Sequence, residues 1–351
     1  MTLVAGALIP VNLITGFLGS GKTTLLQRAL GSPKLGTTAV LINEFGEVGL
    51  DHYLLQRVDE TTVLLESGCV CCTIRGDLRD SIRDLYDRRE RGLVPLFERL
   101  IIETTGLADP APIVTTLAAD PVLRHHFRIS NIVTVVDAVN GLSNLASFEE
   151  SRRQAAVADR LVISKCDIAD TGAIDRLRAS LRRLNPTAVQ HDTARDPDSA
   201  SRLLTGNIED PVANRVEACR WLAEEEHLLA GHDHSGDHRH SQDISRHGDD
   251  IVAFSVRLDE PLQWSAFAVW LTMLLNRHGR AILRIKGLLH VADVPTPVVI
   301  HGVQHTIHPP THLAAWPEGA PQTRLIVIAK GVDRARVETS LAAFNRLATA
   351  A

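Results

Sequence analysis

The sequence predicts an α/β fold in which a mostly parallel sheet is wrapped by helices, followed by a smaller C-terminal α+β domain. Short apolar runs alternate with amphipathic, helix-like segments over the first two thirds of the chain, as in parallel sheets whose strands are joined by helices. After residue 250 the strands and helices are grouped by type instead. A chain of 351 residues with 44% hydrophobic side chains is also longer than one core usually supports. We expect a first domain at 1–205, a linker at 206–249 and a second domain at 250–351.

The individual elements follow from these patterns in chain order. Runs rich in β-branched and aliphatic residues predict strands in the first domain at 9–15, 37–45, 61–67, 99–105, 131–138, 160–167 and 187–192. Apolar residues three and four positions apart predict helices at 22–30, 77–89 and 172–185. The same criteria predict, in the second domain, strands at 251–262, 281–293, 296–308 and 324–331 and helices at 264–279 and 333–348.

Composition argues against several classes of protein. The net charge of −5 gives no broad basic face, so no nucleic-acid partner is expected. The first residues lack the basic region of a signal peptide, and no run of about eighteen apolar residues occurs, so neither secretion nor membrane insertion is expected. We expect a soluble, cytoplasmic protein whose five cysteines are thiols or metal ligands rather than disulfides.

The segment GFLGSGKT, residues 16–23, matches the eight-position phosphate-loop pattern and lies between a predicted strand and a predicted helix. In such a loop the backbone N–H groups surround an anion and the helix N-terminus adds its dipole. Lys22 reaches the β- and γ-phosphates, and the Thr23 hydroxyl ligates Mg²⁺. The predicted nucleotide-binding residues of this loop are Gly16, Gly19, Ser20, Gly21, Lys22, Thr23 and Thr24. A glycine turn that only joins a strand to a helix is the alternative, and the loop favours a phosphate-loop NTPase.

Glu103 lies near the end of the apolar strand predicted at 99–105, and Gly106 directly follows that strand. In nucleotide hydrolases an acidic residue at this place holds the hydration shell of Mg²⁺, and a glycine N–H senses the γ-phosphate. We predict Lys22, Glu103 and Gly106 as the catalytic group, and Thr23, Asp51 and Glu103 as the magnesium site. A solvated carboxylate at a strand end and a plain glycine turn are the structural alternatives.

The segment SKCD, residues 164–167, resembles the guanine-reading motif Asn-Lys-x-Asp of GTPases, with Ser in the first place. The Asp167 carboxylate would accept hydrogen bonds from the guanine N1–H and amino group, which adenine does not offer, while the Lys165 stem packs on the base. The sequence therefore favours GTP over ATP.

Together these stretches resemble the CobW family of phosphate-loop GTPases, and within it the zinc-regulated metalloprotein activators. The matching stretches are TGFLGSGKTTLL, INEFGEVGLD, GCVCCTIRGDL, ETTGLADPAPI, VDAV and SKCD, with RIKGLLHVAD, HGVQHTIH and WPEG in the second domain. The resemblance implies a slow GTPase that delivers a metal ion, most often zinc, from its cysteine motif to a client apoprotein.

Three of the five cysteines, Cys69, Cys71 and Cys72, form a Cys-x-Cys-Cys motif, which we expect in a loop at the same sheet edge as the phosphate loop. Thiolates so spaced can converge on one soft cation, and Zn²⁺ prefers four ligands, so a position stays open for solvent, a client side chain or Glu47. Soft sulfur disfavours Mg²⁺ and Ca²⁺ but does not separate Zn²⁺ from Co²⁺ or Cu(I). Buried small hydrophobes or a redox pair are the alternative.

Two further segments are candidates for metal handling. NEFGEVGLD, residues 43–51, has glycines and acidic residues suited to a switch that is released when the γ-phosphate is lost, or it is a solvated acidic loop. HDHSGDHRH, residues 232–240, is either an auxiliary metal reservoir or a solvated linker. The predicted auxiliary ligands are His232, His234, His238 and His240.

The functional prediction is a GTP-hydrolysing metallochaperone that uses GTP, Mg²⁺ and Zn²⁺, with Co²⁺ as another candidate ion, and acts on a client metalloprotein. Three alternatives stay open. The chain could be a GTP- and metal-responsive binding switch that inserts no metal, a cobalt carrier for cobalamin biosynthesis, or a small-molecule phosphotransferase of the same loop class. A homodimer is also left open, and the sequence identifies no client.

Overall fold

The computed structural model describes residues 8–42, 77–192, 199–205, 219, 251–317 and 321–349, together with the backbone of three strands at 55–57, 62–65 and 70–73. The chain divides into two compact units. One comprises Met1–Ser180 and Ala188–Asn207, and the other comprises Leu181–Thr187 and Ile208–Ala351.

The elements up to residue 205 alternate between strands and helices. In chain order they are β1 (Ile9–Gly16), α1 (Lys22–Leu30), η1 (Pro33–Leu35), β2 (Thr38–Ile42), β3 (Leu55–Arg57), β4 (Thr62–Leu65), β5 (Val70–Thr73), α2 (Leu78–Glu90), β6 (Arg99–Glu103), α3 (Ala111–Ala119), α4 (Leu123–His126), β7 (Phe127–Asp137), α5 (Gly141–Ser147), α6 (Glu149–Val157), β8 (Arg160–Ser164), α7 (Thr171–Leu184), β9 (Val189–Asp192) and α8 (Ser199–Thr205).

The strands of this unit form one sheet in the order β3-β4-β5-β2-β6-β1-β7-β8-β9. All neighbours from β5 through to β9 pair in parallel, whereas β4 is antiparallel to both β5 and β3. The central strands are buried on both faces, which explains their continuous apolar sequences. The predicted mostly parallel α/β fold is confirmed.

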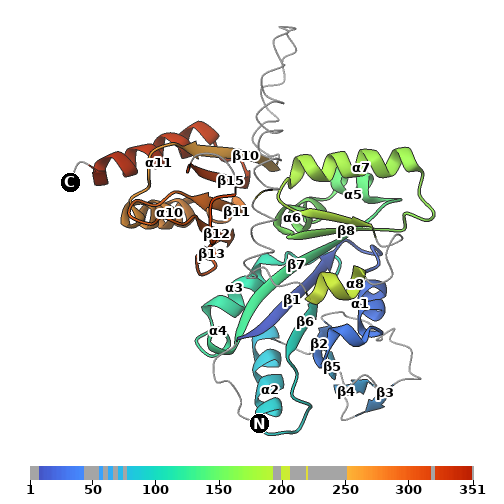
Figure 1. Ribbon diagram of the computed structural model, residues 1–351. Helices are drawn as coiled ribbons and strands as arrows, with labels where there is room; N and C mark the ends of the chain where they lie inside the picture. Colours follow the sequence, from blue (N-terminus) through green and yellow to red (C-terminus); the bar gives the residue numbers. More distant parts are fainter. Residues whose placement is uncertain are drawn as a thin grey trace. The chain divides into compact units, whose positions relative to one another are not determined.

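Helices cover both faces of this sheet (Figure 1). On one face, α1 and α8 pack through Leu26 and Leu203 against Val133 and Val135 of β7. Because side chains alternate along a strand, Thr134 belongs to the other face, where its hydroxyl donates to a backbone carbonyl of α6. The helix α6 therefore lies against the face opposite to α1, next to the centre of the sheet.

The observed strands differ from the predicted ones in several places. β7 begins at Phe127, before the predicted start, because residues 127–129 pair with the first part of β1. The short strands β3 and β5, and a further short strand at Thr311–His312, were not predicted at all. The run predicted as one strand at 296–308 is a hairpin of β12 and β13, because the chain reverses at Gln304, whose φ is 48°.

The second unit contains β10 (Ile251–Leu258), α10 (Trp264–His278), β11 (Ile282–Leu289), β12 (Val298–Val303), β13 (Thr306–Ile307), β14 (Thr311–His312), β15 (Thr323–Lys330) and α11 (Arg334–Thr349). Its sheet is antiparallel in the order β10-β15-β11-β12-β13, with β14 beside β12. One face packs on α10 and α11 through residues such as Phe267, Trp270 and Leu341. The predicted α+β class of this domain is confirmed.

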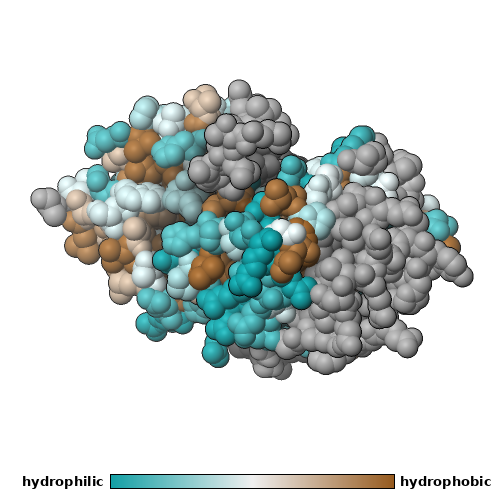
Figure 2. All heavy atoms as spheres, turned by 90° about the horizontal axis from the view of Figure 1, so that it is seen from below, coloured by the Kyte–Doolittle hydropathy of each residue, from teal (hydrophilic) through white to brown (hydrophobic). Residues whose placement is uncertain are grey.

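On the face shown in Figure 2, hydrophobic side chains form small, separate patches among hydrophilic ones. Scattered apolar residues of this kind are normal on a protein surface and mark no extended binding face by themselves. Of the helices that the structure describes, none has the length and apolar character needed to cross a membrane.

Candidate nucleotide and metal site

The phosphate loop connects the carboxyl end of β1 to the first residue of α1, as predicted. Gly16 has a φ of 142°, and a Cβ atom there would lie 2.3 Å from the carbonyl oxygen of Val135. Only glycine fits this close approach to β7. Gly19 and Gly21 also have positive φ angles, 67° and 93°. The loop thus brings backbone N–H groups and a helix N-terminus together, the arrangement that binds phosphate.

Lys22 is the first residue of α1 and is buried. Its Nζ atom lies 3.2 Å from the carbonyl oxygen of Phe17, so the ammonium group folds back over the loop. The backbone N–H of Ser20 also donates to this carbonyl, at 3.2 Å. The only ammonium group of the loop is therefore held against the backbone that would surround a phosphate.

Thr23 and Glu103 meet at the ends of neighbouring elements. The Thr23 hydroxyl donates to Oε1 of Glu103 at 2.6 Å, and Glu103 is 1% exposed. Glu103 ends β6, which pairs with β1 in a register that aligns it with Ile14. A hydroxyl and a carboxylate are hard oxygen ligands, so this pair fits Mg²⁺. The third predicted magnesium ligand, Asp51, lies outside the described residues.

Gly106 lies directly against the phosphate loop. A Cβ atom on Gly106 would come within 2.7 Å of the backbone N and Cα of Leu18. The segment before Gly106 is fixed by Thr104, whose hydroxyl donates to the Thr15 hydroxyl at 2.9 Å and whose N–H donates to the Ile14 carbonyl. Lys22, Thr23, Glu103 and Gly106 are therefore brought together at the carboxyl ends of β1 and β6.

The predicted guanine motif follows β8. The Ser164 hydroxyl donates to the Ser20 carbonyl at 2.6 Å, which ties this motif to the phosphate loop. Lys165 has a φ of 57°, and its Nζ atom lies 2.5 Å from Oδ2 of Asp137. Asp167 is exposed, so its carboxylate is accessible to a ligand.

Asp137, at the end of β7, was not predicted as a site residue. Burial raises the pKa of this carboxyl, but hydrogen bonds from Lys165, from the Asn140 side chain and from two backbone N–H groups outweigh burial and leave the pKa below its ordinary value. A charged Asp137 therefore fixes the lysine of the guanine motif. Its signal in the sequence is an acidic residue, in VDAV, directly after a predicted strand.

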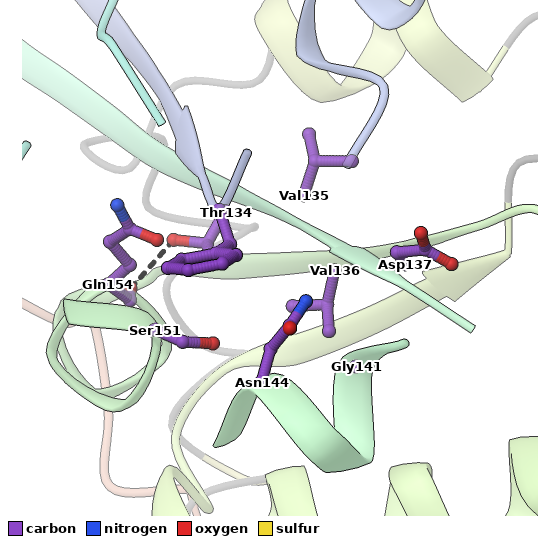
Figure 3. A pocket seen from close by; sticks show the side chains of 9 residues that line it. Thr134, Val135, Val136, Asp137, Gly141, Asn144, Ser151 and Gln154 are labelled. Carbon is purple, nitrogen blue, oxygen red and sulfur yellow. Dashed lines mark hydrogen bonds between the residues drawn. The ribbon is translucent and has the colours of Figure 1, made fainter. Parts of the chain in front are cut away.

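A small pocket lies between β7 and the helices α5 and α6 (Figure 3). Thr134, Asp137, Asn144 and Gln154 are among the residues that line it. Its volume of about 10 Å³ has room for about one water molecule, so it is not the site of a nucleotide base.

The cysteine motif requires a correction. Cys71 and Cys72 belong to strand β5, not to a loop at the sheet edge, and pair with Val40 and Leu41 of β2. Hydrogen bonding to both β2 and β4 fixes this segment as a strand, to which Val70 and Thr73 are suited by their β-branched side chains. Cys69 and Glu47 lie outside the described residues.

The remaining metal predictions also fall outside the described part of the chain: the segment 43–51 and the histidines His232, His234, His238 and His240. Within the residues that the structure does describe, no three His, Cys, Asp or Glu side chains are grouped so that they could hold a metal ion.

Comparisons with known proteins extend over both units. Residues 10–191 match the family described as CobW/HypB/UreG, nucleotide-binding domain, and residues 251–345 match the cobalamin synthesis protein cobW C-terminal domain. The chain is 28% identical to the zinc chaperone YjiA of Escherichia coli (strain K12), with 96% of this chain and 99% of that protein covered. It is 30% identical to the zinc chaperone CobW of Pseudomonas aeruginosa, with 95% and 91% covered.

A solved structure supports the same relationship. The crystal structure of the Zn(II)-bound YjiA GTPase from E. coli has a TM-score of 0.70 and 26% sequence identity, covering 96% of this chain and 99% of that chain. The phosphate loop, the Thr23–Glu103 pair and the family matches over both units lead to one conclusion: this chain belongs to the CobW/HypB/UreG family and carries the CobW-type C-terminal domain.

Proposed function

We propose that this protein is a GTP-hydrolysing metallochaperone that binds Zn²⁺, or a similar transition-metal ion, at its Cys-x-Cys-Cys motif and transfers the ion to a client metalloprotein. Relatives over nearly the whole chain are named zinc chaperones, and the similar solved structure is that of a GTPase with Zn(II) bound. The observation that carries the proposal is the register that joins the cysteine strand to the nucleotide site.

That register runs across three parallel strands. Thr73 of β5 pairs with Ile42 of β2, and Ile42 pairs with Glu103 of β6. Thr73 is thus the residue of β5 that is aligned with Glu103. Cys72 comes one residue, and Cys71 two residues, before that aligned position. Neighbouring strands are about 4.8 Å apart, so the backbones of β5 and β6 are separated by about 10 Å. Only β2 lies between Glu103 and strand β5, which contains Cys71 and Cys72. A rearrangement around Glu103 could therefore displace β5 through β2.

The nucleotide half of the function follows from the phosphate loop. Lys22 would stabilise the charge that develops on the transferred phosphate, and Thr23 with Glu103 would hold Mg²⁺, which supplies charge neutralisation at the β- and γ-phosphates. Asp167 would select guanine, while Asp137, which accepts a hydrogen bond from Lys165, would keep that side chain beside the base. Gly106, which lies against this loop, would contribute its N–H to the γ-phosphate.

The metal-binding part of the proposed function rests on the chemistry of cysteine sulfur. Cys69, Cys71 and Cys72 offer soft ligands, and Glu47 or a client side chain could complete the four that Zn²⁺ prefers. Because neighbouring residues of a strand face opposite sides of the sheet, Cys71 and Cys72 would bind one ion together only after this segment leaves the strand conformation. An ion enclosed on one side only can be passed on. GTP binding would strengthen this site, and hydrolysis would release the segment 43–51 and weaken it.

The test measures Zn²⁺ affinity by chelator competition, with Co²⁺ as a competing ion, in the presence of a non-hydrolysable GTP analogue or of GDP. We expect tighter Zn²⁺ binding with the analogue. Lys22→Ala should bind Zn²⁺ equally in both states, because that variant no longer responds to the third phosphate. Equal affinities in the unaltered protein would overturn the coupling.

A second arm locates the metal. In a chain lacking residues 227–247, the triple variant Cys69→Ser, Cys71→Ser, Cys72→Ser should lose tight Zn²⁺ while still binding GTP. The matched control is Cys166→Ser with Cys219→Ser. Burial, and next the neighbouring Asp192, raise the pKa of Cys166 to about 11, so this thiol stays protonated at neutral pH and is a poor zinc ligand. Stoichiometric zinc retained by the triple variant would refute the site.

A further inference from the structure

Gln154 of α6 holds the loop that contains Gly106. The side chain is 1% exposed, and its Nε2 atom donates to the carbonyl oxygens of Gly106, at 3.1 Å, and Ala108, at 3.0 Å. A carboxamide has two N–H donors, so both are used on two carbonyls of the same loop. Its own backbone carbonyl accepts the Thr134 hydroxyl at 2.7 Å, which fastens this turn of α6 to the sheet (Figure 3).

The same helix contacts the nucleotide site at two further points. Arg153 lies 3.4 Å from the carboxylate of Asp109, just beyond the loop carbonyls that Gln154 holds. Phe148, directly before α6, packs its ring on that of Phe17 in the phosphate loop, with ring centroids 4.6 Å apart. The helix α6, together with the residue directly before it, thus contacts both segments that the sequence predicts around the γ-phosphate.

The position of Gly106 is limited from both sides. Movement towards the phosphate loop is blocked by Leu18, whose backbone would lie 2.7 Å from a Cβ atom at Gly106. Movement away from the loop breaks the two hydrogen bonds from Gln154. Because these are buried bonds to carbonyl groups, losing their donor leaves two acceptors without partners, which disfavours the displaced loop.

We propose that Gln154 is a positioning residue for GTP hydrolysis, which holds the Gly106 carbonyl and thereby keeps the N–H of the same residue where it can meet the γ-phosphate. The inference rests on the proposed GTPase function. It adds that the Gln154 side chain is the group that makes the site sensitive to the γ-phosphate. We call the two hydrogen bonds from Gln154 to the Gly106 loop the clamp. Because GDP has no γ-phosphate, the clamp affects GTP affinity and turnover but not GDP affinity.

The test compares Gln154→Glu and Gln154→Met with the unaltered full chain. Glutamate has nearly the same size but donates at most one hydrogen bond, when it is protonated, and methionine has neither polar group. We expect turnover, measured as phosphate release at saturating GTP, to fall by about tenfold to a hundredfold, the scale reported for misplaced or missing transition-state contacts. The dissociation constant of GDP should stay within about twofold, well below the tenfold that 1.4 kcal/mol produces.

The matched control is Asn345→Asp in the second unit. Asn345 is a carboxamide of similar burial, 2% exposed, whose Nδ2 atom donates to the Pro261 carbonyl at 3.0 Å. The same chemical change there should lower thermal stability without altering turnover or the ratio of GTP-analogue to GDP affinity.

The outcomes separate the two proposals. If the unaltered protein hydrolyses GTP and the Gln154 variants match it in turnover and in the affinity ratio, the clamp is refuted and the GTPase function stands. Equal losses of GTP and GDP affinity would show a merely structural role and also refute the clamp. If the unaltered protein neither binds nor hydrolyses GTP, both proposals fall together.

Discussion

Ser164 occupies the position where the guanine-reading motif of GTPases has Asn, and its hydroxyl makes a hydrogen bond to the phosphate loop. It donates at 2.6 Å to the carbonyl of Ser20 in the phosphate loop, across 144 residues of sequence. The side chain is buried, so water does not replace this bond easily. The short side chain of Ser164 therefore connects the base-reading motif to the phosphate loop.

Ser164→Ala should weaken binding of both GTP and GDP by about fivefold, because one buried hydrogen bond contributes roughly 1 kcal/mol. Ser164→Thr keeps the hydroxyl and should bind both nucleotides nearly as well as the unaltered protein. Equilibrium titration with a fluorescent guanine nucleotide measures the effect. Undiminished affinity in the alanine variant would show that the bond does not support the site.

Asp137 makes part of the stability dependent on pH. Its folded-state pKa lies below the ordinary value of 3.8, so the unfolded chain binds the proton more readily. The contribution of this carboxylate to stability is therefore complete above about pH 4 and is lost as the pH falls through the folded-state pKa.

Asp137→Asn should accordingly lower the free energy of unfolding at pH 6, and the difference from the unaltered protein should shrink as the pH falls below 4. Urea unfolding across this range measures the difference. Asp175→Asn, an exposed position on α7, serves as the control. A difference that stays constant with pH would contradict the assignment of the charged form.

At the scale of elements, the site depends on how closely the segment after β6 approaches the loop after β1. Gly106→Ala would place a methyl group 2.7 Å from the backbone of Leu18, which a rigid loop does not accommodate. We expect GTP turnover to fall by about a hundredfold, the scale of a displacement near 1 Å at a catalytic group.

Gly31→Ala is the matched control for that change. Gly31 follows α1 with a φ of −71°, and a Cβ atom there would meet nothing closer than 3.6 Å. This variant should keep full turnover and melt at the same or a slightly higher temperature, since alanine restricts the unfolded chain. Similar turnover losses in both variants would show that the close approach of Gly106 to Leu18 is not the cause.

At the scale of the whole molecule, the histidine tract is separate in sequence from both family matches, which end at residue 191 and resume at residue 251. We expect deletion of residues 227–247 to remove weakly bound Zn²⁺ equivalents and to leave GTP turnover within about twofold, because a histidine-rich sequence binds such ions weakly and with little selectivity. Zinc titration by calorimetry measures the stoichiometry. Replacing residues 227–247 with a Gly/Ser segment of equal length controls for linker length. Loss of the tightly bound Zn²⁺ in the deletion variant would contradict this prediction.

The sequence alone determined the features that depend on local pattern. The phosphate loop, the strand that contains Glu103, the Ser-Lys-Cys-Asp motif and the change of class after residue 250 are each visible in a few consecutive residues. In each case the residue types match the chemistry or the secondary structure at that place. The family followed from the order and spacing of these same stretches.

The tertiary structure decided what depends on distant segments meeting. It assigned Cys71 and Cys72 to a strand, because β2 and β4 supply the backbone hydrogen bonds that a turn would lack. It also placed Gln154 against the Gly106 loop and Asp137 beside Lys165. These pairs are separated by 48 and 28 residues, and only the packing of α6 on the sheet and the parallel pairing of β7 with β8 bring them together.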